Sequence, residues 1–185
     1  IDVVNAYILT LVSAIAAVTF AFARQSVEKE IAVEKHHLFY AALLLCLTGL
    51  LGITITGDAF NIFVFLEVSS LSAYALIGMG KSPRAQLAAF RYLVMGTIGG
   101  TFVLLGIGLL LMATGTLNIG ELVKLVPGAA DTTMVRAAFA FIAVGSCIKL
   151  ALFPLHMWLP DCYTYAPTVV SAFLSATATK VSYYV

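Results

Sequence analysis

The chain has 185 residues, of which 62% are hydrophobic and only 10% are charged, and its mean hydropathy is +1.04. Soluble globular domains carry about 25% charged residues, so this composition excludes a soluble domain and predicts an integral membrane protein. The formal net charge of +1 gives no basis for binding nucleic acid.

Six apolar stretches are long enough to cross a bilayer, which takes about 20 apolar residues in a helix. We predict spanning helices over residues 3–23, 38–56, 59–79, 87–113 and 135–153, and a sixth that begins near residue 168. Gly57 ends the second stretch, and Asp58 is well placed to N-cap the third. The sequence does not show the alternation of apolar and polar residues that is typical of the strands of membrane barrels. The predicted fold class is therefore an all-α polytopic membrane protein with about six transmembrane helices.

The connectors predict how the chain is oriented, because cytoplasmic loops are rich in Lys and Arg. The connector at residues 24–37 contains three such residues. Between the third and fourth spans lie Lys81 and Arg84, and Arg91 lies just inside the fourth. The turn between the second and third spans contains none. We therefore expect the first and third connectors to face the cytoplasm.

The fifth span leads into a helix that we predict to be broken, with the sequence SCIKLALFPLHMWLPD. Pro154 lacks an N–H group, and its ring clashes with the carbonyl of Leu150. Lys149 lies inside the apolar run, where a charge costs about 3 kcal/mol on insertion scales. A broken helix beside an ionisable group is typical of proteins that move ions. His156 follows the break, where it could carry protons near neutral pH or simply bond a freed carbonyl.

Two further ionisable groups lie deep in apolar stretches. At 1.5 Å per residue, Glu67 lies about 14 Å into the third span, Lys149 about 20 Å into the fifth, and Lys180 about 18 Å into the sixth. Ser70 and Tyr74 share the helix face of Glu67. Such groups are rare in spanning helices and usually face a partner or a cavity.

These groups suggest a proton relay made of Glu67, Lys149, Lys180 and His156. Burial disfavours a charged lysine and a nearby carboxylate favours it, so a small change in their distance could switch its protonation. Other interpretations are a carboxylate satisfied by a neighbour, a lysine that reaches the interface, and a structural subunit whose charges lock helices together. A carrier of organic substrates would need an arginine at mid-depth, which is missing.

No cofactor or metal site is predicted. The cysteines Cys46, Cys147 and Cys162 lie far apart in or beside apolar stretches, so we interpret them as small buried hydrophobic residues. His36 and His37 are adjacent at a helix start, so their side chains point apart and are not expected to bind a metal ion together. A glycine-rich phosphate loop, a haem motif and a hydrolytic arrangement are all missing, so the sequence leaves an enzymatic activity undecided.

Two segments resemble a known family: GDAFNIFVFLEVSSLSAYALIG and KLALFPLHMWLPDCYTYAPTVVSAFLSATATK. They resemble the antiporter-like membrane subunits shared by Mrp-type Na+/H+ antiporters, respiratory complex I (NADH:quinone oxidoreductase) and membrane-bound hydrogenases. The resemblance implies that Glu67 pairs with Lys149 and that Lys180 is the second lysine of the family pattern. The spacing of the two lysines, and Leu174 where other members have a histidine, favour the D-type Mrp subunit.

The same resemblance implies about fourteen helices in two inverted five-helix repeats. Residues 1–185 would then be one transmembrane domain, a fragment of a longer subunit that covers the first repeat incompletely. It also implies a proton-translocating subunit in the cell membrane, with other membrane subunits of a hetero-oligomeric complex and the lipid bilayer as partners. Protons would be driven by Na+ exchange or by a redox module in other chains. The alternative is a structural subunit of a complex I or hydrogenase-type assembly.

Overall fold

The computed structural model describes residues 3–184, which form eight α-helices and one short 3-10 helix, η1 (Val33–Lys35). The helices are α1 (Val3–Glu30), α2 (His36–Ile55), α3 (Ala59–Gly78), α4 (Pro83–Thr114), α5 (Ile119–Ala129), α6 (Thr133–Lys149), α7 (Trp158–Tyr165) and α8 (Thr168–Tyr184). Four of them, α1 to α4, are long and apolar enough to cross a membrane, counting η1 with α2. Helices α6 and α8 have 17 residues each. The all-helical prediction is confirmed, whereas the count of six spanning helices is not.

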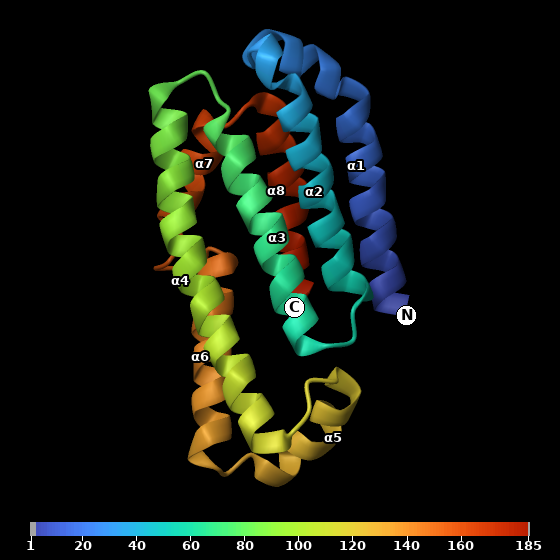
Figure 1. Ribbon diagram of the computed structural model, residues 1–185, viewed down its shortest axis with the longest axis vertical. Helices are drawn as coiled ribbons and strands as arrows, with labels where there is room; N and C mark the ends of the chain where they lie inside the picture. Colours follow the sequence, from blue (N-terminus) through green and yellow to red (C-terminus); the bar gives the residue numbers. More distant parts are fainter. Residues whose placement is uncertain (1–2, 185) are drawn as a thin grey trace.

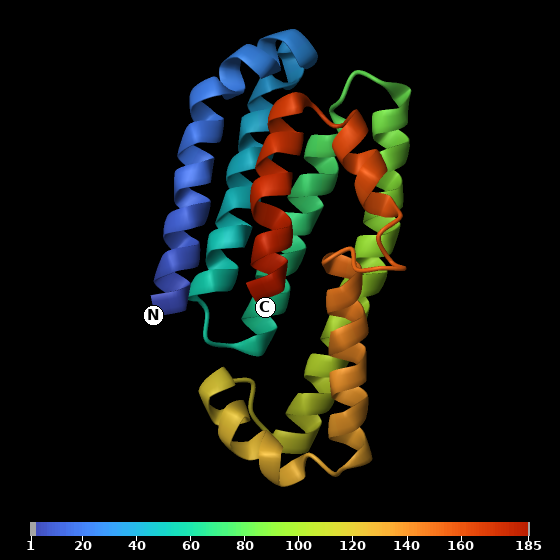
Figure 2. The same cartoon turned by 180° about the vertical axis from the view of Figure 1, so that it is seen from behind.

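The helices form two groups that meet along α3 and α4. In Figure 1, α1, α2, α3 and α8 lie side by side, and α4 stands beside them with α6 and α7. Helix α6 packs along the lower half of α4, and α7 lies along its upper half, as the view from behind also shows (Figure 2). The interruption between α6 and α7 therefore lies at mid-height.

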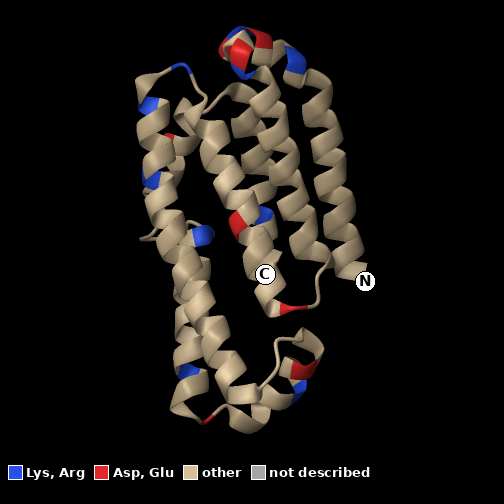
Figure 3. Cartoon of the chain, viewed as in Figure 1, with Lys and Arg blue, Asp and Glu red and all other residues tan. Residues whose placement is uncertain are grey.

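Charged residues gather at the two ends of the molecule, with few at mid-height (Figure 3). At one end, the Lys81 ammonium donates to the backbone carbonyl of Lys29, which joins the first and third connectors. At the other end, the Ala59 N–H donates to the Leu117 carbonyl at 2.9 Å, which ties the α2–α3 turn to the segment before α5. The first and third connectors thus share one end of the molecule, as the orientation prediction requires.

Helix α1 does not end at residue 23, as predicted, but continues to Glu30. Hydropathy marks where lipid contact ends, not where a helix ends. Arg, Lys and Glu are good helix formers, and Arg24 pairs with Glu28 one turn on at 2.8 Å. Most of the charged connector is consequently helical.

Helix α6 ends at Lys149 rather than at residue 153. Pro154 disfavours helical geometry in the residue before it and excludes a helical bond to the carbonyl of Leu150. The chain then turns at Ala151, whose φ of 53° is left-handed. The predicted break is confirmed, and it begins directly after the lysine.

Asp58 begins α3 as predicted. Its carboxylate accepts a hydrogen bond from the Asn61 N–H at 2.9 Å, which satisfies one of the unpaired donors in the first turn. This cap fixes where α3 starts and therefore how deep Glu67 lies.

Candidate functional site

The last residue of α6, Lys149, meets two polar groups of α3. Its Nζ donates to Glu67 Oε1 at 2.8 Å and to Ser70 Oγ at 3.0 Å. The side chain of Lys149 is 5% exposed and that of Glu67 is 21% exposed. The structure therefore joins two of the predicted site residues in a buried ion pair, together with the serine expected on the same face.

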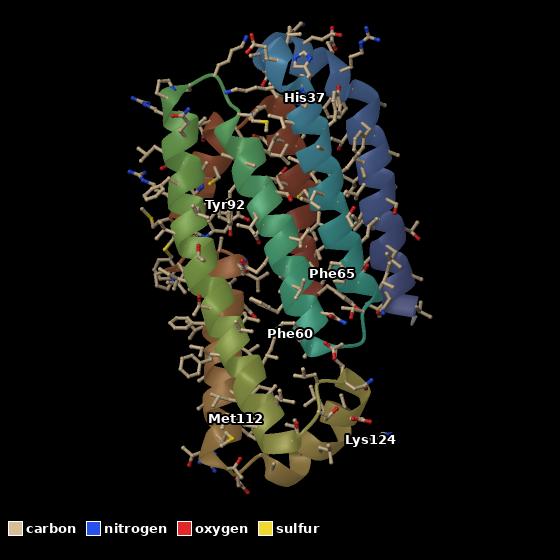
Figure 4. All side chains as sticks on the ribbon, viewed as in Figure 1. His37, Phe60, Phe65, Tyr92, Met112 and Lys124 are labelled. Carbon is tan, nitrogen blue, oxygen red and sulfur yellow. The ribbon has the colours of Figure 1, made fainter. Side chains whose placement is uncertain are left out.

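Helix α3 can present this polar face because Glu67, Ser70 and Tyr74 recur at helical spacing. Ser70 and Tyr74 are both buried. The Tyr74 hydroxyl has no hydrogen-bond partner among residues 3–184. Its ring packs edge-on against Tyr92 of α4 at a centroid distance of 4.5 Å. Tyr92, labelled in Figure 4, thus lies between α4 and α3.

The broken end of α6 is held by hydrogen bonds to its last carbonyls. The Leu150 N–H donates to the Ser146 carbonyl at 2.8 Å. The indole N–H of Trp158, the first residue of α7, donates to the Ile148 carbonyl at 3.2 Å. The Trp158 ring also stacks on Tyr92 at 4.1 Å. The sequence analysis did not predict this bond, which the need of a buried indole for an acceptor could have suggested.

A small cavity adjoins Lys149 and reaches α8. Its volume is about 20 Å³, which is enough for one water molecule. Hydroxyl and ammonium groups from α3, α4, the end of α6, α7 and α8 line it: Ser69, Ser70, Tyr92, Lys149, Tyr163, Thr179 and Ser182. Because hydroxyl groups both donate and accept hydrogen bonds, this lining suits a water molecule beside the lysine.

Lys180 and His156 lie outside this ion pair. In the structure of residues 3–184, the side chain of Lys180 is exposed. Its Nζ donates to the Ser175 carbonyl at 2.5 Å and to Thr179 Oγ1 at 3.3 Å. Thr179 also lines the cavity, so it lies between Lys180 and the space beside Lys149. His156 does not line the cavity, and its buried Nδ1 has no partner among the described residues.

A second ion pair, which the sequence interpretation did not identify, joins α4 to α7. Arg91 Nη1 donates to Asp161 Oδ2 at 2.6 Å, and the two side chains are 55% and 36% exposed. Arg84, two turns before Arg91 on α4, donates to the Tyr165 hydroxyl at 3.0 Å. An arginine inside a spanning helix signals that an acid or aromatic partner lies nearby, although the sequence alone does not say which.

No group of three or more metal-ligating side chains occurs between residues 3 and 184. Cys46 and Cys162 are buried as expected, whereas Cys147 is only half-buried. None of the three is in a disulfide.

Comparisons with known proteins agree with the resemblance seen in the motifs. Residues 56–185 match the family model described as "NADH:quinone oxidoreductase/Mrp antiporter, TM". The N-type subunit of NADH-quinone oxidoreductase from Desulforudis audaxviator is 53% identical over 146 residues, which cover 79% of this chain and 29% of the relative. In the solved Mrp complex from Dietzia sp. DQ12-45-1b, one chain is similar to the whole of this chain, with a TM-score of 0.86 and 30% sequence identity. The match covers 34% of that Mrp chain.

Relatives of both the N type and the D type match the chain, but the identities do not support the preference for the D type. The D-type Na(+)/H(+) antiporter protein of Alkalihalophilus pseudofirmus is 30% identical over 183 residues, 99% of this chain and 36% of the relative. This is well below the identity to the N-type relative. The spacing of two lysines is a single feature, whereas the sequence identity counts every aligned position, so the two can favour different relatives. The chain spans about a third of the length of the relatives it matches.

Proposed function

Because the chain belongs to the NADH:quinone oxidoreductase/Mrp antiporter transmembrane family, we propose that it is part of a proton-translocating subunit of a multi-subunit membrane complex. In this proposal residues 1–185 are one transmembrane domain of a longer subunit, and other membrane subunits are its partners. The coupled driving force is either Na+ exchange or a redox module in other chains, since relatives carry both kinds of name.

The proposed carrier of the proton is Lys149. Its ammonium has three N–H donors, of which two bond to Glu67 and Ser70. One donor is left for a water molecule in the adjoining cavity. A lysine can release a proton where an arginine cannot, and Glu67 would set when it does so, because a change in the distance between carboxylate and ammonium changes which protonation state is favoured.

The proposed route leads from Lys149 through the cavity to Lys180. The observation that carries it is the lining of that cavity, which includes both Lys149 and Thr179. Thr179 accepts a hydrogen bond from Lys180, so water and one hydroxyl would complete the connection. His156, which does not line the cavity, would act beside the break rather than between the lysines.

The test is proton transport by the full-length subunit in its complex, reconstituted in proteoliposomes, with Lys149→Met. We expect transport per assembled complex to fall to background, even though the unpaired Glu67 carboxylate lowers the amount of complex that assembles. Lys124→Met is the matched control, because Lys124 is exposed on α5 and has no described ion-pair partner. Normal transport by a normally assembled Lys149→Met complex would refute the relay.

A structural role is the second candidate, and the ion pair itself favours it. The bond between Lys149 and Glu67 joins residues 82 positions apart and so ties α6 to α3. If locking is its only purpose, Lys149→Met should prevent assembly, and the complexes that do assemble should transport protons normally.

A further inference from the structure

The face of α4 that meets α3 contains two buried glycines, Gly96 and Gly100, one helical turn apart. A Cβ atom on Gly100 would lie 2.3 Å from Glu67 Oε1 and 2.9 Å from Glu67 Cδ. A Cβ atom on Gly96 would lie 1.9 Å from the Tyr74 hydroxyl. Unbonded carbon and oxygen atoms approach to about 3.3 Å, so two polar groups of α3 occupy the space where α4 lacks side chains.

The other glycines of α4 have different surroundings. Gly99 and Gly106 face α6, where a Cβ atom would lie 3.1 Å from a side-chain carbon of Ile148 and 2.5 Å from one of Ile142, respectively. Gly108 is open, since a Cβ atom there would meet nothing within 4 Å. The contact with a charged group is therefore particular to Gly100 and is not shared along the helix.

We propose that Gly100 is a positioning residue, which holds the Glu67 carboxylate at hydrogen-bond distance from Lys149. A glutamate side chain has several staggered rotamers, and in the observed one Oε1, the oxygen bonded to Lys149, occupies the recess at Gly100. A methyl group at this position would displace the nearest oxygen by about 1 Å, because 2.3 Å would have to become about 3.3 Å. This inference rests on the proposed function, since it concerns the same ion pair.

The recess also explains why α3 and α4 approach so closely at the site. A helix with alanine at both positions would have to move away from α3 or force both polar side chains into other rotamers. Either outcome changes the distance between Glu67 and Lys149, because the backbone of Lys149 belongs to α6, whose end is held by Trp158. Gly100 thus acts on Lys149 through Glu67.

The test compares alanine substitutions on one helix, in the full-length subunit within its complex. Gly100→Ala should lower proton transport by about tenfold to 100-fold, since misplacement by 1 Å can cost this much. Gly108→Ala, the same change in open space, should leave transport unchanged. Gly106→Ala should lower thermal stability through its clash with Ile142, and this variant measures what a purely structural defect does.

A double-mutant cycle separates the contact with Glu67 from general packing. Glu67→Ala removes the atoms that the added methyl group would meet, so Gly100→Ala should lower the thermal stability of the unchanged protein and have no further effect on that of Glu67→Ala. If Gly100→Ala fails to assemble, adding Glu67→Ala should restore assembly. Transport by Gly100→Ala equal to that of Gly108→Ala, or the same loss of thermal stability in both backgrounds, would overturn the inference.

The two proposals fail in different ways. Normal transport in Lys149→Met refutes the proposed function. A transport-dead Lys149→Met complex together with a fully active Gly100→Ala complex refutes only the positioning role of Gly100.

Discussion

Neutralising Glu67 and Lys149 singly and together distinguishes a proton relay from a structural lock. Glu67→Gln keeps the shape of the side chain and removes its charge. The ammonium of Lys149, 5% exposed, then has only neutral acceptors, the new amide and Ser70 Oγ. Lys149→Met leaves the opposite imbalance, a carboxylate without its cation. Each single variant therefore buries one unpaired charge.

The magnitude follows from how deeply the pair is buried. Removing one member of a buried pair costs about 3–5 kcal/mol, and because Glu67 is 21% exposed we expect the lower end of this range. The double variant Glu67→Gln/Lys149→Met removes both charges, and neutral replacements of buried pairs are often harmless. Because two single costs of about 3 kcal/mol each are then both avoided, it should be more stable than their sum predicts by up to about 6 kcal/mol.

The assay combines thermal unfolding of the purified full-length subunit with proton transport by its complex in proteoliposomes. We expect the double variant to approach the stability of the unchanged protein and yet to transport no protons. Arg91→Gln/Asp161→Asn is the matched control, because that pair is 55% and 36% exposed and should show a coupling below about 1 kcal/mol. A double variant that is stable and also transports normally would refute the relay and support locking.

Two predictions concern the elements that hold the site in place. Asp58→Ala should destabilise α3 by about 1 kcal/mol, because it removes the N-cap, whereas Asp58→Asn should be nearly neutral, and equal unfolding midpoints for both would contradict the capping role. Trp158→Phe keeps an aromatic ring on Tyr92 but leaves the Ile148 carbonyl without its donor, which should cost about 1–3 kcal/mol and slow transport. If thermal unfolding and transport are both unchanged, that hydrogen bond does not hold the end of α6.

The boundaries of α2 and α3 could be predicted because the turn between them has a clear chemical signature. Gly57 and Asp58 interrupt the apolar run, and the observed ends at Ile55 and Ala59 agree closely with the predicted spans. Helices α1 and α4 continue beyond their apolar stretches, because helix formation does not stop where lipid contact stops. Hydropathy therefore locates a span better than it locates a helix end.

The depth of Glu67 and Lys149 could be obtained by counting residues, but their contact could not. Both groups were expected near mid-membrane from the rise of a helix alone. Whether they meet depends on how α3 and α6 both pack against α4, and that packing depends on glycines such as Gly100. Their pairing was predicted only through the family resemblance. The cavity beside Lys149 is beyond sequence reasoning, because α3, α7 and α8 all contribute to it.

The position of Lys149 at a helix end, rather than within a helix, explains how the apolar interior accommodates its charge. The last carbonyls of a helix lack partners within it and carry partial negative charge, which favours a cation nearby. Trp158 takes one of these carbonyls, and Glu67 adds a full negative charge from α3. A break in the backbone and a buried ammonium are each unfavourable in hydrocarbon. Because Lys149 lies in the last turn of α6, the negative end of the helix dipole adds to the stabilisation that Glu67 gives its charge.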